Sequence, residues 1–158
     1  MNTLVISAFP CCGKTYAFEH RQDRYKILDS DSSQFSWLKD TDGNNTKERN
    51  PDFPNNYIKH IKENIGKVDV IFVSSHLAVR EAMENARINF VTFYPKQNML
   101  NEWVGRMYRR GSSPDFIDFQ IKNWDKFVGN IHNEPHGRDL IELGNNEYID
   151  LDCARTVY

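Results

Sequence analysis

The sequence has no long hydrophobic run, and this excludes a large class of proteins. A helix that spans a bilayer needs about 20 consecutive apolar residues, and no apolar stretch among these 158 residues approaches that length. The chain also enters its first apolar segment at Leu4, without the charged and hydrophobic regions of a secretory signal peptide. We therefore expect a cytoplasmic protein with no part in a membrane.

Cysteine is scarce as well. Three cysteines do not make a disulfide framework, and the spacing of a four-ligand zinc site is absent. Cys11 and Cys12 are adjacent, close to Lys14 and to the predicted start of a helix, a setting that would lower the pKa of the Cys12 thiol and make it reactive. The pattern favours the simpler interpretation, in which both are small loop residues that face inward.

An excess of charge of one sign is also missing. Lysine and arginine total 20 and aspartate and glutamate total 22, which gives a net charge of -2. This balance implies no general attraction to nucleic acid, although a local basic groove would still admit a polynucleotide. Without repeats, low-complexity segments or a second domain, we expect one domain over residues 1–158, as a monomer or a homodimer.

A phosphate-binding motif stands out near the start of the chain. Residues 8–15 fit the pattern G-x-x-x-x-G-K-[S/T] at every fixed position except the first, and they read Ala8, Phe9, Pro10, Cys11, Cys12, Gly13, Lys14, Thr15. An apolar run precedes them and a helical pattern follows. Successive backbone N–H groups of such a loop bind phosphate oxygens, the helix adds its positive dipole end, the lysine reaches the β- and γ-phosphates, and the threonine hydroxyl holds Mg²⁺.

Apolar segments alternate with helical patterns along the rest of the chain. Strands are predicted at residues 4–7, 25–28, 69–76, 89–95 and 139–143, and helices at 15–23, 31–39, 56–65, 77–86, 97–110 and 115–131. The polar residues 40–56 are predicted to form an exposed loop. Strands that alternate with helices indicate right-handed βαβ units, and therefore a three-layer α/β/α fold around a five-stranded parallel sheet. The pattern does not give the strand order.

The chain resembles the P-loop kinases of the nucleoside and nucleotide kinase-like branch, which includes adenylate, shikimate, gluconate and polynucleotide kinases and small phage-type members. The resemblance covers most of the chain by layout and rests on the loop at residues 8–15, the Asp-Ser-Asp sequence at 29–31 and the arginines at 106–110. It implies a P-loop NTPase fold with strand order 2-3-1-4-5, ATP as the co-substrate and Mg²⁺ as the cofactor.

The Asp-Ser-Asp sequence resembles that of shikimate kinases. The resemblance implies that Asp29 assists the metal together with Thr15, and that Asp31 contacts the acceptor. A hydroxyl must lose its proton to attack a γ-phosphate, and a positioned carboxylate can accept it. Asp31 would also suit the N-cap of the next helix, and one residue can do both.

The arginine cluster resembles the lid of these kinases, expected at about residues 97–115. Arg106, Arg109 and Arg110 have i, i+3, i+4 spacing and so share a helix face. In such a lid, arginines neutralise the charge that develops during phosphoryl transfer. The residues 111–114, Gly-Ser-Ser-Pro, would let the segment hinge. A basic helix end that favours the C-terminal dipole is the alternative.

The acceptor is expected between the polar insert at residues 40–56 and the helix that begins after residue 76. Arg49 and Arg80 are available there as ligands for an anionic acceptor. The third strand ends in Ser74, where many P-loop proteins have a metal-holding aspartate. This departure argues against motor-type and switch-type NTPases but is tolerated among kinases of this branch.

The sequence thus predicts an ATP-dependent phosphotransferase. The expected acceptor is a nucleoside or deoxynucleoside monophosphate. An alternative is a hydroxyl acceptor, namely a nucleoside, a small metabolite or a polynucleotide 5′ end, which Asp31 favours because a phosphate acceptor needs no base. A second alternative is a non-catalytic ATP-binding protein, suggested by Ala8 and by the missing acid.

Overall fold

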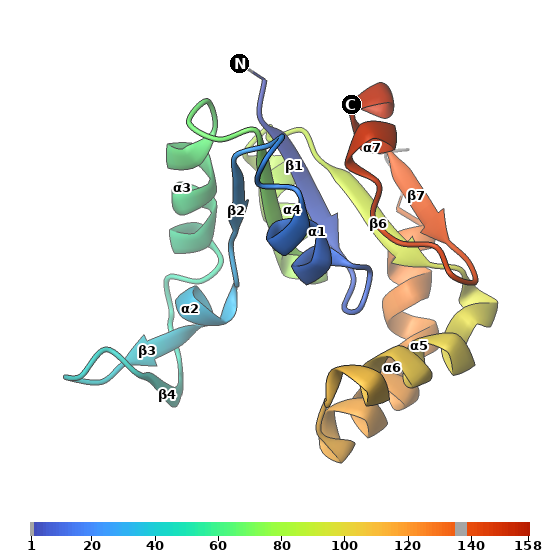
Figure 1. The fold of residues 1–158 in the computed structure, drawn as a ribbon. Helices are drawn as coiled ribbons and strands as arrows, with labels where there is room; N and C mark the ends of the chain where they lie inside the picture. The colour runs from blue at the N-terminus through green and yellow to red at the C-terminus, as the bar shows by residue number, and fades with distance from the viewer. Residues whose placement is uncertain (1, 135–138) are drawn as a thin grey trace.

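The computed structural model describes residues 2–134 and 139–158, and in them a five-stranded parallel sheet forms the centre of the molecule (Figure 1). Its strands are β1 (Leu4–Ala8), β2 (Ile27–Asp29), β5 (Val70–Ser74), β6 (Val91–Pro95) and β7 (Leu140–Leu143). They lie in the order β2-β5-β1-β6-β7, and every neighbouring pair is parallel. This is the order 2-3-1-4-5 that the resemblance implied.

The apolar strands bury both faces of this sheet. In β1, Leu4 and Ile6 pack with one group of core residues, and Val5, which lies between them, packs with a second group on the opposite face. All three are at most 1% exposed. A strand that is covered on both faces has no reason to alternate apolar with polar residues, which is why these segments are continuously apolar.

Helices cover the two faces. Helices α1 (Lys14–His20) and α7 (Leu151–Val157) lie on one face, and α3 (Asn55–Asn64), α4 (Leu77–Asn85) and α6 (Pro114–His132) lie on the other (Figure 1). A 3₁₀ turn at Gln97–Met99 leads into α5 (Leu100–Arg110), which lies with α6 beyond the carboxyl ends of the strands. No helix of the described ranges has both the length and the apolar character needed to cross a membrane.

The segment between β2 and α3 differs from the prediction. The expected helix at residues 31–39 is reduced to α2 (Ser33–Ser36). An antiparallel hairpin of β3 (Trp37–Lys39) and β4 (Asn45–Arg49) replaces the end of that helix and the first part of the expected loop. Asp40 closes its turn, since its Oδ1 accepts the N–H groups of Asp42 and Asn44, both at 2.9 Å. A hairpin this exposed buries few apolar side chains, so the hydrophobic pattern gives little sign of it.

The helix α7 was not predicted either. It begins at a capped end, where Asp150 Oδ1 accepts the N–H groups of Asp152 and Cys153 at 3.0 and 3.2 Å. Leu151 and Ala154 are its buried residues. The cap and the i, i+3 spacing were readable in the sequence, but seven residues are too few for a clear helical period.

Candidate functional site

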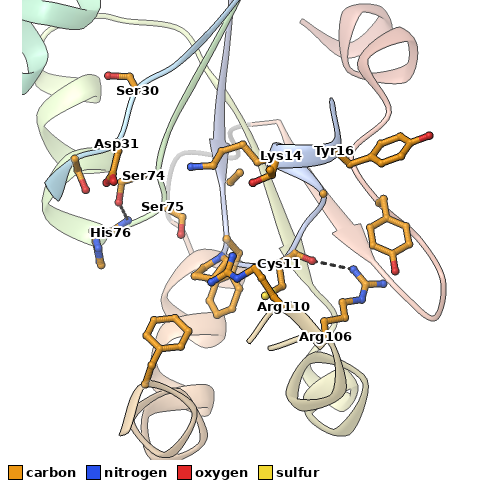
Figure 2. Close-up of a pocket in the computed structure, with 18 of the residues that line it drawn as sticks. Cys11, Lys14, Tyr16, Ser30, Asp31, Ser74, Ser75, His76, Arg106 and Arg110 are labelled. Atoms are coloured by element: carbon orange, nitrogen blue, oxygen red, sulfur yellow. Dashed lines mark hydrogen bonds between the residues drawn. The ribbon is translucent and has the colours of Figure 1, made fainter. Parts of the chain in front are cut away.

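A cleft of about 580 Å³ opens at the carboxyl ends of β1, β2 and β5, and most of its lining comes from four segments distant in sequence (Figure 2). They are the loop after β1, the ends of β2 and β5, and the end of α5. Its lining residues are Ala8, Phe9, Pro10, Cys11, Gly13, Lys14, Thr15, Tyr16, Ser30, Asp31, Ser32, Ser74, Ser75, His76, Arg106, Arg109, Arg110, Phe116 and Tyr148. The structure therefore brings together all three motifs that the sequence singles out.

The loop after β1 carries a row of unused hydrogen-bond donors. Within the described residues, the backbone N–H groups of Cys11 through Tyr16 donate to no protein acceptor, and the first such bond after them runs from the Ala17 N–H to Gly13 O at 3.0 Å. Backbone donors near the protein interior almost always have partners. A run of six without one suits an anion that would accept several of them.

Donors from outside the loop fix the direction of these groups. Three successive carbonyl groups of the loop each accept one bond: Pro10 O from Trp103 Nε1 at 2.9 Å, Cys11 O from Arg106 Nη1 at 3.1 Å, and Cys12 O from the Ile149 N–H at 2.9 Å. The C=O and N–H of a trans peptide point in opposite directions. Because the three carbonyl groups point toward these donors, the N–H groups of the three following residues point the opposite way. The N–H groups are therefore oriented before any anion binds.

Left-handed backbone conformations make the turn of the loop. Gly13 has φ 95° and Cys11 has φ 63°. Such a φ costs little for glycine but strains an L-residue such as Cys11. Ala8, the departure from the motif, ends β1 and is not among the residues with positive φ. The position where the motif usually has glycine therefore makes no demand here that alanine cannot meet.

Gly13→Ala is expected to destabilise the protein more than Gly66→Ala. Both glycines have positive φ, 95° and 87°, so each alanine carries a backbone strain of about 1–2 kcal/mol. A Cβ on Gly13 would also lie 3.1 Å from Tyr148 Cδ1 and 3.2 Å from Tyr148 Cβ, whereas a Cβ on Gly66 would meet nothing within 4 Å. Thermal unfolding of the two variants measures the difference, and equal losses of Tm would contradict this packing of Tyr148.

The lysine and threonine of the motif stand at the start of α1. Lys14 Nζ lies 3.2 Å from Asp29 Oδ1, and the Thr15 side chain lines the cleft. Asp29 ends β2 and does not itself line the cleft, but its carboxylate is paired with Lys14, which does. The threonine hydroxyl and the aspartate carboxylate are the hard oxygen ligands that Mg²⁺ takes together with waters and phosphates. The residues present therefore fit the expected ion.

The three arginines of α5 do not act alike. Arg109 and Arg110 are exposed and line the cleft, as a phosphate-neutralising pair would. Arg106 has a side chain only 4% exposed; its Nη2 donates to Glu147 O at 2.8 Å, and its guanidinium pairs with Glu102 at 3.3 Å. The guanidinium also lies over the rings of Trp103 and Tyr148, at 3.9 and 4.1 Å from their centroids. Arg106 therefore connects α5 to the loop after β1 and to Glu147 and Tyr148.

The segment that was expected to hinge as a lid is packed against the core in this structure. Trp103 and Met107 of α5 are fully buried in the core, and α5 is bonded to the loop through Trp103 and Arg106. The turn to α6 is capped at both ends, by Gly111 with φ 80° and by Ser113 Oγ, which accepts the Phe116 N–H at 3.2 Å. In the structure α5 forms a packed wall of the cleft. The apolar side chains that predict this helix are the ones that pack it against the core.

The ends of β2 and β5 face these cations with polar side chains. Asp31 lines the cleft and its Oδ1 accepts the Ser33 N–H at 2.9 Å. The N-cap of α2 is Ser32, so the alternative that Asp31 caps this helix is wrong by one residue. Ser74 Oγ accepts the His76 N–H at 3.2 Å. Figure 2 shows Asp31, Ser74 and His76 together on one side of the pocket, away from Arg106.

The two arginines expected to bind the acceptor lie outside the cleft lining. Arg80 is 2% exposed; its Nη1 pairs with Glu134, and its Nε donates to Ser75 O at 2.9 Å. Burial lowers the pKa of Arg80 to about 10, against the opposing effect of Glu81 and Glu84. A guanidinium buried in α4 cannot meet a substrate, so the prediction for Arg80 is wrong in position. Arg49 is exposed on the hairpin, 4.2 Å from the centroid of the Trp37 ring.

His76 gives a measure of how close Arg49 comes to the cleft. Burial and the positive charges of Arg49 and Arg80 hold the pKa of His76 below its usual range, so the ring is neutral at pH 7. Arg49→Gln removes one of those charges and should raise the pKa of His76, which NMR titration of the imidazole measures. Lys59→Gln, at an exposed position of α3, is the control and should leave the pKa of His76 unchanged. No rise in Arg49→Gln would place the hairpin away from His76.

The reactive-thiol interpretation of Cys12 is not supported. Burial raises the pKa of Cys12, which is 1% exposed and whose Sγ donates to Phe93 O at 3.7 Å. Burial also raises the pKa of Cys11, against the opposing effect of Arg110 and Arg106. Both thiols therefore stay protonated near neutral pH, as small residues of a tight loop.

Two residues that hold the site together were not given that role from the sequence. Tyr57 is fully buried; its hydroxyl donates to Ser30 O at 2.6 Å and accepts the Ser74 N–H at 3.3 Å, which joins the ends of β2 and β5. The sequence placed Tyr57 near the acceptor site and gave it helical spacing with Ile58 and Ile61, but it did not indicate that the hydroxyl joins two strand ends. Trp103 appeared only as part of an apolar helix face.

Comparison of the chain with protein-family models, with curated proteins and with solved structures gave no match in any of the three searches. Function is therefore inferred from the geometry of the cleft.

Proposed function

We propose that the protein is a P-loop phosphotransferase that binds Mg-ATP in this cleft and passes the γ-phosphoryl group to a small acceptor. The observation that carries the proposal is the row of six unpartnered N–H groups from Cys11 to Tyr16, counted over the described residues, beside Lys14. The helix α1 is short, so the loop amides and the side-chain cations supply most of the positive field.

Each charged group has a part in the transfer. Lys14 would exchange Asp29 for the β- and γ-phosphates of the nucleotide, and Asp29 and Thr15 are the residues that would hold the metal. Mg²⁺ neutralises phosphate charge when it is bound. Arg109 and Arg110 are exposed in the cleft and stabilise the charge on the transferring group, whose transition state needs positioning and positive charge more than covalent help.

A nucleoside monophosphate and a hydroxyl compound are both candidate acceptors. The first was expected from the sequence, with Arg49 and Arg80 as its ligands. The burial of Arg80 removes half of that support, while the place of Asp31 in the cleft wall supports a hydroxyl acceptor. A non-catalytic ATP-binding protein remains the alternative from another class, because β5 ends in Ser74 and offers no metal-holding acid.

Equilibrium binding of Mg-ATP, measured by calorimetry, tests the proposal. We expect ATP and ADP to bind and adenosine not to bind, because the unpartnered amides and Lys14 recognise phosphates. Arg109→Ala should bind ATP with little change and turn it over slowly. Equal affinity for ATP and adenosine, or no affinity for either, would overturn the assignment of the loop.

A further inference from the structure

The acceptor half of the cleft holds no positive side chain. Among the described residues that line it after β2 and β5, the one ionised group is Asp31, and the others are Ser30, Ser32, Ser74, Ser75 and His76. All the lining lysines and arginines belong to the loop after β1 and to α5: Lys14, Arg106, Arg109 and Arg110. A phosphate monoester placed beside Asp31 would meet like charge with no cation of this half to offset it.

A buried hydroxyl in this half has no partner. Ser30 is 4% exposed and lines the cleft, yet its Oγ bonds to no atom of the described residues. Its backbone is fully engaged, since its N–H donates to Phe72 O at 3.0 Å and its C=O accepts from Tyr57 Oη at 2.6 Å. The side chain is thus held in place with an unpartnered hydroxyl whose oxygen has under 1 Å² of accessible surface. Such groups in proteins meet a buried water or a ligand group that enters the wall beside them.

Within the described part of the chain, Asp31 has one carboxylate oxygen that accepts a hydrogen bond and one that does not. Its Oδ1 accepts the Ser33 N–H at 2.9 Å, which fixes the carboxylate, and no bond to Oδ2 is found among the described residues. Ser74 Oγ accepts from the His76 N–H and keeps its own proton to donate. The acceptor half therefore offers hydroxyl donors and one carboxylate acceptor, the set that a neutral polyhydroxylated compound satisfies.

We infer that the acceptor is a neutral hydroxyl-bearing small molecule of the nucleoside or sugar type, and that Ser30 and Asp31 bind its hydroxyl groups. The inference rests on the proposed phosphotransferase function. The acceptor oxygen attacks the γ-phosphorus of ATP and forms the new P–O bond, while the bond to the β–γ bridging oxygen breaks and ADP leaves with that electron pair. The proton of the attacking hydroxyl passes to Asp31 Oδ2 and then to water.

Arg49 gives the sharpest contrast with an anionic acceptor. It is the cation of the hairpin nearest His76, and it is held over the Trp37 ring outside the cleft lining. If the acceptor were a monophosphate, Arg49 would be its remaining partner, and Arg49→Gln would raise the acceptor KM. If the acceptor is neutral, Arg49→Gln leaves that KM unchanged.

The experiment measures ADP formation from Mg-ATP with a panel of nucleosides, pentoses and hexoses, the matching nucleoside 5′-monophosphates and a 5′-hydroxyl oligonucleotide. We expect at least tenfold stimulation by a nucleoside or sugar and none by any monophosphate. Ser30→Ala should raise the KM of that acceptor about tenfold, the loss of one buried hydrogen bond, and leave ATP affinity unchanged. Ser33→Ala, outside the cleft lining, is the matched control.

Other outcomes overturn the inference in separable ways. Stimulation by a monophosphate, with a raised KM in Arg49→Gln, would show an anionic acceptor and keep the phosphotransferase. Stimulation by the oligonucleotide alone, or by no compound while Mg-ATP still binds, would reject a neutral small acceptor. Absence of Mg-ATP binding would reject the phosphotransferase itself.

Discussion

Lys14→Ala should lower the rate of ATP turnover by about a thousandfold, the usual cost of removing one preorganised charge-stabilising group. Lys14 is the one ammonium group among the residues that line the cleft in the described structure, and it begins α1 directly after the row of free amides. It now holds Asp29 at 3.2 Å, so its loss also leaves that carboxylate without its cation. Steady-state ADP formation measures the effect.

The fold should survive this substitution, because the Lys14 side chain is 32% exposed and packs into no core cluster. Circular dichroism and Tm check that point. Lys62→Ala, an exposed lysine in the last turn of α3, is the control and should retain full turnover. A Lys14→Ala protein with wild-type turnover would remove the loop from the mechanism.

Arg106→Ala should weaken both the fold and the nucleotide site. It leaves two backbone carbonyl groups, Cys11 O and Glu147 O, without their donor and Glu102 without its cation. Breaking a buried ion pair on one side costs about 3 kcal/mol or more, which corresponds to a fall in Tm of roughly 6–12 °C for a chain of this size. With Cys11 O released, the amide that follows is no longer held, and Mg-ATP affinity should fall about tenfold.

Two variants separate this anchoring role from a direct contact with phosphate. Arg106→Lys keeps the charge but has no planar fork to reach both carbonyl groups and lie between the two rings, so it should lose stability nearly as far as Arg106→Ala. Arg109→Ala should keep stability and ATP affinity and lose turnover. If Arg106→Lys restored both Tm and affinity, Arg106 would act by charge alone, as the predicted lid arginine does.

The sequence predicts the motifs of this site but not the long-range hydrogen bonds that hold the loop in place. All five strands of the sheet were recognisable, most clearly the buried β1 and β5 and least clearly β7, which contains Glu142. Lys14, Thr15 and Asp31 were placed in or beside the cleft by motif. The donors that orient the loop come from far along the chain: Trp103 and Arg106 lie 93 and 95 residues from their carbonyl partners. Spacing along the sequence carries no signal of such pairings.

Arg80 and Ser30 show the same limit from opposite sides. Arg80, in the helix predicted after the third strand, was expected to be available to substrate, but it is buried and paired with Glu134. The sequence gave no role to Ser30, which lies between Asp29 and Asp31, but the Tyr57 bond to its carbonyl group holds it in the cleft wall, and its hydroxyl has no partner among the described residues. Burial decided both roles, and a helix or strand assignment alone does not give it.

The central claim is that this cleft moves the γ-phosphoryl group of ATP to an acceptor. Incubation of the protein with Mg²⁺, a nucleoside or sugar acceptor and ATP labelled at the γ-phosphorus tests it most directly. The account predicts that label appears covalently on the acceptor with wild-type protein and is absent with Lys14→Ala. Label that stays in ATP, or leaves only as free phosphate whatever the acceptor, would contradict it.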